Sequence, residues 1–120
     1  MDRPLSSREQ QVLVAMIDHA GAFDDQATPT AAARSGWRAR VPGLRVDGVC
    51  GCGTCPSISL ADRSAPAPDA AEGRVVLMAG LTDALVLLFI DRGVPSYLEL
   101  APHDDEIVYP EFPDPTTLSF

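Results

Sequence analysis

The fold is decided by the stretch from Ala84 to Leu100, which has the sequence ALVLLFI-DRG-VPSYLEL. Its first part, Ala84 to Ile90, is apolar throughout, as is typical of a strand covered on both faces. A helix is the alternative for so short an apolar run, but the Val, Phe and Ile content and the turn that follows favour a strand. Asp91-Arg92-Gly93 is typical of a hairpin turn. Residues 94–100 then alternate apolar and polar, which predicts a second, antiparallel strand.

Three further segments extend this hairpin into a sheet. Residues 44–49 and 57–60 alternate in the way that half-buried strands do, and residues 74–79 form another short apolar run. We therefore expect an antiparallel sheet of about five strands.

Two helices are expected before the first strand. Ser6-Ser7-Arg8-Glu9 matches a capping box, in which the serine and the glutamate satisfy each other's backbone N–H groups. Apolar residues then recur at helical spacing, and they are Leu13, Met16, Ile17 and Ala20. This pattern predicts a helix over residues 7–20. A second, short helix is predicted with Thr28 as N-cap, Pro29 in its first position and Gly36 at its end. The fold class is α+β, with both N-terminal helices packed on one face of the sheet.

The chain of 120 residues has the size of one domain, over residues 1–120. Residues 61–73 are rich in Ala, Pro and Asp, which predicts a mobile loop. Residues 101–120 contain four prolines, and proline cannot donate to a sheet, so we expect an extended tail that wraps the surface. Its aromatic residues would anchor the tail, and they are Tyr109, Phe112 and Phe120.

The formal net charge of −8 argues against nucleic acid as a partner, because a protein that binds phosphates must neutralise them. The same charge would steer the chain toward a basic protein. Residues 1–9 lack the apolar core of a signal peptide, and no apolar run approaches the roughly 20 residues that span a bilayer. We therefore expect a cytoplasmic protein without membrane contact. No feature of the sequence indicates an oligomeric state.

All three cysteines lie in residues 50–60, with the sequence CGCGTCPSISL, between two predicted strands. Cys52 and Cys55 have the spacing that lets two thiolates converge on one ion, and Cys50 lies two residues earlier. A fourth ligand must come from elsewhere. His103 is our candidate, and the alternatives are His19, an aspartate or a water molecule. The predicted metal ligands are therefore Cys50, Cys52, Cys55 and His103, with zinc as the candidate cofactor.

Two other interpretations of the cysteines stay open. Cysteine behaves as a small hydrophobe, so the three side chains could pack inside a Gly-rich turn. Neighbouring thiols can also close a disulfide under oxidation, which would make the turn a redox sensor. We favour packing first and a metal site second. A catalytic thiol needs an adjacent base and an orienting group, and the sequence does not show such a pair, so we predict no catalytic residues and no enzyme activity.

The order of segments resembles a family of small, uncharacterised actinobacterial proteins. The resemblance is carried by the core Cys-Gly-Cys-Gly-Thr-Cys-Pro-Ser of residues 50–57, by Leu98-Glu99-Leu100, and by Glu111-Phe112-Pro113-Asp114-Pro115. This family has a similar Cys-Gly-Cys-Pro-Ser core and no assigned activity, so the resemblance implies neither catalytic residues nor a cofactor.

Two function hypotheses follow. The first is a non-catalytic protein-interaction module, of the kind that an immunity protein forms against a basic toxin, because the chain is acidic and lacks an active-site motif. The alternative is a metal-binding or redox-responsive thiol module built on Cys50, Cys52 and Cys55.

Overall fold

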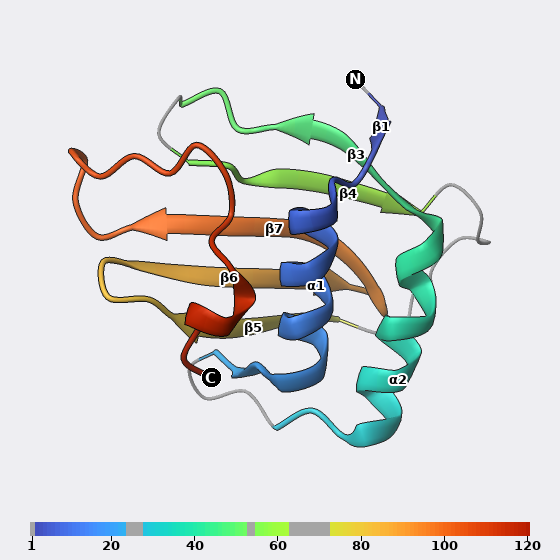
Figure 1. Ribbon diagram of the computed structural model, residues 1–120. Coiled ribbons are helices and arrows are strands. Elements are labelled where there is room, and N and C mark those ends of the chain that lie inside the picture. The colour runs from blue at the N-terminus through green and yellow to red at the C-terminus, as the bar shows by residue number, and fades with distance from the viewer. Residues whose placement is uncertain (1, 24–27, 53–54, 63–72) are drawn as a thin grey trace.

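The computed structural model describes residues 2–23, 28–52, 55–62 and 73–120. The strands are β1 (Arg3–Pro4), β2 (Gly21–Ala22), β3 (Leu44–Val49), β4 (Ile58–Asp62), β5 (Arg74–Gly80), β6 (Ala84–Asp91) and β7 (Val94–Pro102), and the helices are α1 (Ser7–His19) and α2 (Ala31–Arg40). The strands form one antiparallel sheet in the order β1-β3-β4-β7-β6-β5-β2. Both helices lie on the same face of this sheet (Figure 1).

The predicted α+β class is confirmed, but the described sheet has seven strands rather than about five. The two additional strands, β1 and β2, have two residues each and pair with β3 and β5 at the edges of the sheet. So short a strand has no alternating pattern that the sequence could reveal. The edge strands matter to the fold because they satisfy backbone groups that would otherwise be exposed.

The β6–β7 hairpin forms as predicted, with a turn at Arg92 and Gly93. Arg92 has φ 54° and Gly93 has φ 79°, the positive values that a two-residue turn between twisted strands requires. The expectation that β6 is covered on both faces is wrong. Its residues alternate between buried and half-buried, because both helices pack on one face of the sheet and no described element packs on the other.

The core lies between α1, α2 and the inner face of the sheet. Four apolar residues of α1 are fully buried, and they are Val12, Leu13, Met16 and Ile17. From the sheet, Leu88 and Leu98 stand opposite each other in β6 and β7, and neither is exposed to solvent. The helical spacing in the sequence therefore identified the buried face of α1 correctly.

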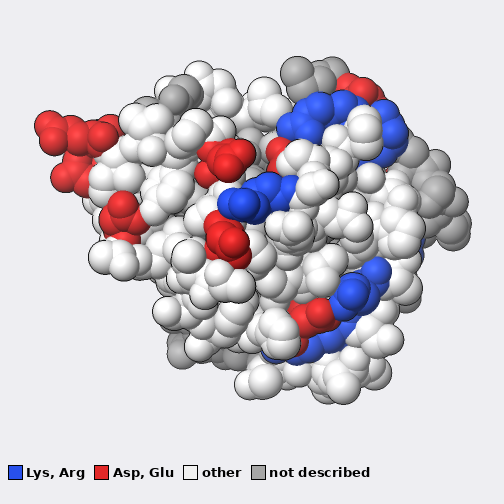
Figure 2. All heavy atoms as spheres, in the orientation of Figure 1, with Lys and Arg blue, Asp and Glu red and all other residues white. Residues whose placement is uncertain are grey.

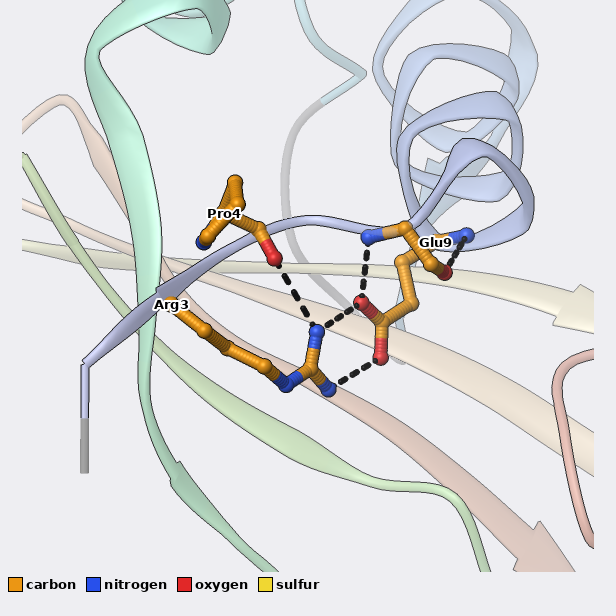
Figure 3. A network of polar contacts seen from close by, with 4 residues as sticks. Arg3, Pro4 and Glu9 are labelled. Atoms are coloured by element: carbon orange, nitrogen blue, oxygen red, sulfur yellow. Dashed lines mark hydrogen bonds and ion pairs between the residues drawn. The ribbon is translucent and has the colours of Figure 1, made fainter.

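The capping box at the start of α1 is present and is extended by Arg3 (Figure 3). Glu9 accepts from the Ser6 N–H at 2.8 Å, and Ser6 Oγ accepts from the Glu9 N–H at 3.1 Å. The guanidinium of Arg3 also donates to both carboxylate oxygens of Glu9, at 2.8 and 2.9 Å. Because Glu9 is buried, this network holds β1 and the start of α1 together.

The second helix begins and ends later than predicted. Thr30 is the N-cap, and its Oγ1 accepts from the Ala33 N–H at 3.0 Å. Gly36 lies inside the helix and does not end it, because the next residue, Trp37, is buried in the core. Burial of a tryptophan outweighs the roughly 1 kcal/mol that glycine costs a helix. The helix ends where Pro42 enters a 3₁₀ turn (Val41–Gly43).

The loop predicted over residues 61–73 begins later, because residues 61 and 62 belong to β4, and residues 63–72 lie outside the described part of the chain. The tail starts after β7 and runs beside α1 on the helix side of the sheet (Figure 1). Phe112 is buried in the core and Tyr109 packs against it, as predicted. Phe120 is 54% exposed and is not an anchor. Leu118 is buried in its place.

Candidate metal centre

The three cysteines lie in the turn between β3 and β4. A register shift between Val46 and Gly48 marks a bulge in β3 just before the turn. The Cys50 N–H then donates to the Ser57 carbonyl at 2.9 Å, which closes the turn at its base. This hydrogen bond fixes the two ends of the cysteine segment across from each other, so that Cys50 and Cys55 approach from opposite sides.

The three sulfur atoms come together. The Sγ atoms of Cys50, Cys52 and Cys55 all lie within 4.8 Å of one another, and those of Cys52 and Cys55 are 3.3 Å apart. Tetrahedral zinc with bonds of about 2.3 Å to sulfur holds its thiolates about 3.8 Å from each other. The Cys52–Cys55 separation of 3.3 Å is shorter than this value by about 0.5 Å, and the whole cluster lies within 4.8 Å, so the three thiolates are close enough to bind one ion. None of the three cysteines forms a disulfide in the structure.

The cluster is not part of the apolar core. Cys52 is exposed, and Cys50 and Cys55 are half-buried. A cysteine that serves as a small hydrophobe is usually among the most buried residues of a protein. The packing interpretation, which the sequence favoured, therefore has little support from the burial of these side chains.

Ser57 connects the cluster to the sheet. Its Oγ accepts from the Leu100 N–H at 3.0 Å and lies 3.3 Å from Cys55 Sγ, to which the hydroxyl donates. The Leu100 carbonyl, at 3.5 Å, is a second acceptor for the same proton. Ser57 is almost fully buried, so these contacts hold Cys55 in a fixed position relative to β7.

The neighbouring cysteines influence the ionisation of Cys50. The backbone N–H of Cys52 lowers the pKa of Cys50, but hydrogen bonds with the side chains of Cys52 and Cys55, together with the charge of Cys55, raise this pKa more strongly. On balance, these effects raise the pKa of Cys50 above its ordinary value. The pKa of Tyr97 is raised as well, first by burial and then by the nearby charges of Cys50, Glu99 and Cys55. Negative charge at the cluster is thus unfavourable unless a cation accompanies it.

A cavity of about 200 Å³ lies next to the cysteines. Its lining includes Cys50 and Cys55 as well as Arg3, Arg8 and Phe112. Arg3 is paired with Glu9, and Arg8 donates to the Phe112 carbonyl at 3.2 Å. A larger cavity of about 540 Å³ lies between α2 and the β6–β7 turn, next to Trp37, and none of the described cysteines lines it.

His103 is not one of the donors in the sulfur cluster. The close group of ligand atoms consists of the three cysteines, within the residues that the structure describes. His103 is exposed directly after β7, and its backbone N–H donates to the Asp83 carbonyl at 2.9 Å. Its role as the fourth ligand stays a prediction.

Sequence reasoning missed the roles of Ser57 and Tyr97. Ser57 was assigned to a strand, whereas it precedes β4 and bridges to Leu100 through its side chain. The available signal was the position of Ser57 directly after Cys55-Pro56. Proline interrupts the regular main-chain pairing of a strand, so a serine directly after it is placed to accept from the neighbouring strand through its side chain. Tyr97 carried no signal of its own, because its closeness to the cysteines depends on the pairing of β4 with β7.

Comparisons with protein-family models, with curated proteins and with solved structures found no match for this chain. The resemblance to the actinobacterial family with the Cys-Gly-Cys-Pro-Ser-like core therefore stays a prediction. In the described part of the chain, no helix has both the length and the apolar character needed to cross a membrane.

Proposed function

We propose that the protein binds a zinc ion through the thiolates of Cys50, Cys52 and Cys55. The observation that carries this proposal is the convergence of three sulfur atoms within 4.8 Å of one another. Thiolate is the ligand that zinc and other soft ions prefer, and three thiolates at one point form a strong donor set for such an ion.

The electrostatics of the turn favour a bound cation over three free thiols. The side chains of Cys52 and Cys55 oppose the ionisation of Cys50, whose pKa is raised. Zinc replaces the thiol protons and offsets the negative charge, so binding releases protons and stabilises the turn. Three thiolates leave one tetrahedral position, which a water molecule or His103 would occupy.

The proposed role is non-catalytic. A catalytic zinc site needs an open position beside a substrate pocket and groups that act on the substrate. The cavity next to Cys50 and Cys55 is small, at about 200 Å³, and its arginines are engaged with Glu9 and with the Phe112 carbonyl. The site is better suited to stabilising the β3–β4 turn.

Zinc titration tests the proposal. Protein purified under reducing conditions without chelator is titrated with zinc against a chromophoric chelator. We expect one equivalent to bind, and Cys52→Ser to lower the affinity at least about tenfold. A wild-type protein that binds no zinc would contradict the proposal, and so would a Cys52→Ser variant with unchanged affinity. The same titration after oxidation tests the redox alternative, because a disulfide between Cys52 and Cys55 would prevent binding reversibly.

A matched pair of histidine variants identifies the fourth ligand. His103→Ala should weaken zinc binding as Cys52→Ser does if His103 is the fourth ligand. His19→Ala is the control, because His19 contacts Phe120 at the far end of α1. If the two histidine variants bind zinc equally well, water is the fourth ligand.

A second candidate function is the binding of a basic protein. It is supported by Asp104, Asp105 and Glu106, which are all exposed in the loop after β7, and no described arginine forms an ion pair with them. Figure 2 shows acidic side chains projecting at the end of the molecule where this loop lies. Charge reversal of the three residues should abolish capture of a basic partner from native lysate at low salt, and unchanged capture would contradict this function.

A further inference from the structure

The outer face of the sheet is apolar where an antiparallel sheet is normally polar. The outward residues of β6 are Leu85, Leu87 and Phe89, and all three are half-buried. An antiparallel sheet with one solvated face usually has polar side chains on that face. The apolar character of β6 on both sides therefore calls for a second cover that the described elements do not supply.

The neighbouring strands continue this face. By register, Val76 and Tyr97 flank Phe89, and Met78 flanks Leu87. We call this surface the outer patch, and it consists of Val76, Met78, Leu85, Leu87, Phe89 and Tyr97. Within it, Phe89 and Tyr97 meet edge to face with ring centroids 6.1 Å apart, and the guanidinium of Arg74 lies 5.2 Å from the Phe89 ring centroid.

We infer that the outer patch is a dimer interface, on which a second copy of this chain packs sheet against sheet. The area fits a weak, reversible dimer. With about 4.8 Å per strand and about 3.3 Å per residue, the three strands that carry the outer patch, β5, β6 and β7, present a face of roughly 14 by 25 Å, or about 700 Å² over two copies, which lies at the low end for protein interfaces.

The charge of the outer patch favours a second copy over a basic partner. Arg74 and Asp91 at its edge pair with each other at 2.7 Å, and Glu99 is the other charged residue on the outward side of β5, β6 and β7. The surroundings of the patch thus carry a net charge near −1, although the whole chain carries −8. A basic protein would be attracted to the acidic loop after β7, whereas two nearly neutral apolar faces do not repel each other.

Sedimentation velocity over a concentration series from about 1 mM to about 1 μM tests this inference, since an interface of this size implies weak affinity. We expect a species of twice 12.7 kDa at high concentration that dissociates on dilution. A wild-type protein that stays monomeric throughout would overturn the inference.

Two variants locate the interface. Leu87→Lys places a charge in the centre of the outer patch, and it should leave the protein monomeric at every concentration. Met78→Glu places a charge in the same patch from β5 and should have the same effect. Circular dichroism shows whether each variant folds, and the second variant tests the interface if the first does not fold. Val108→Lys is the control, because Val108 is 57% exposed in the tail, and it should dimerise like the wild type. A folded Leu87→Lys or Met78→Glu protein that still dimerises would overturn the inference.

Discussion

Ser57 Oγ accepts a hydrogen bond from the backbone N–H of Leu100 at 3.0 Å, where the main-chain pairing of β4 with β7 has ended. The side chain thus takes the place of a backbone carbonyl in the ladder. The same hydroxyl donates to Cys55 Sγ at 3.3 Å. One buried serine therefore connects the stability of the sheet to the position of a proposed zinc ligand.

Replacement of Ser57 by Ala should affect both properties. The buried Leu100 N–H loses its partner, so the free energy of unfolding should fall by about 1–3 kcal/mol in urea with chelator present. Zinc affinity should fall about 10-fold or more, because Cys55 loses its orienting contact. Ser59→Ala is the control, since Ser59 lies on the outward side of β4 opposite Tyr97 and should change stability by less than about 0.5 kcal/mol. Equal losses of stability and of zinc affinity in Ser57→Ala and Ser59→Ala would contradict the role of Ser57.

Glu9 gives the fold a pH dependence. Burial raises the pKa of this carboxyl, but the hydrogen bonds from Arg3 and from the Ser6 N–H together lower it further, so its folded pKa lies below its unfolded one. The stabilisation is therefore complete above the ordinary pKa of Glu, about 4.3, and is lost as the pH falls through the folded pKa.

Glu9→Gln should accordingly lower the free energy of unfolding at pH 7 by about 1.5–3 kcal/mol, because charged hydrogen bonds are lost. The difference from wild type should shrink as the pH is lowered below about 4. Glu111→Gln is the control, since Glu111 is exposed and lies 4.0 Å from Arg8. A constant difference from pH 7 to pH 3 would show that the Glu9 charge is not the cause.

The β6–β7 turn contains a strained residue that can be relieved. Arg92 has φ 54°, and a residue with a Cβ in this region costs about 1–2 kcal/mol, less for asparagine. Arg92→Asn should therefore raise the free energy of unfolding by about 0.5–1 kcal/mol. Gly93→Ala should lower it by about 1 kcal/mol or more, because Gly93 has φ 79°. Thermal unfolding of both variants checks the signs, and a stabilised Gly93→Ala protein would contradict the described turn.

Replacement of the two phenylalanines of the tail should change the free energy of unfolding by very different amounts. Phe112 is 1% exposed, so Phe112→Ala should lower the free energy of unfolding by about 3–5 kcal/mol. Phe120 is 54% exposed and contacts His19, so Phe120→Ala should cost less than about 1 kcal/mol. Urea unfolding measures both, and similar losses in the two variants would mean that the tail packs differently.

Local pattern was sufficient to predict α1 and the long strands. The capping box of Ser6 and Glu9 and the apolar spacing after it are local signals, and the structure confirms both. The prediction failed where tertiary packing outweighed local preference. Gly36 stays helical because Trp37 is buried beside it, and β6 is covered on one face because both helices pack on that face.

The candidate site was predictable only in part. The spacing of Cys52 and Cys55 predicted two converging thiols, and the convergence of Cys50 depends on the hydrogen bond that closes the β3–β4 turn. The support from Ser57 and the closeness of Tyr97 arise from the pairing of β4 with β7. Residues 58 and 98 are paired across forty positions of the chain, and no local pattern in the sequence indicates such a pairing.

X-ray absorption spectroscopy at the zinc edge tests the central claim most directly, because it counts the sulfur atoms bound to the ion. For the zinc-loaded wild-type protein, we predict three sulfur ligands at about 2.3 Å and one lighter ligand, oxygen or nitrogen, at about 2.0–2.1 Å. Cys52→Ser should retain at most two sulfur ligands. A first shell of oxygen and nitrogen alone in the wild-type protein would contradict a thiolate zinc site in this turn.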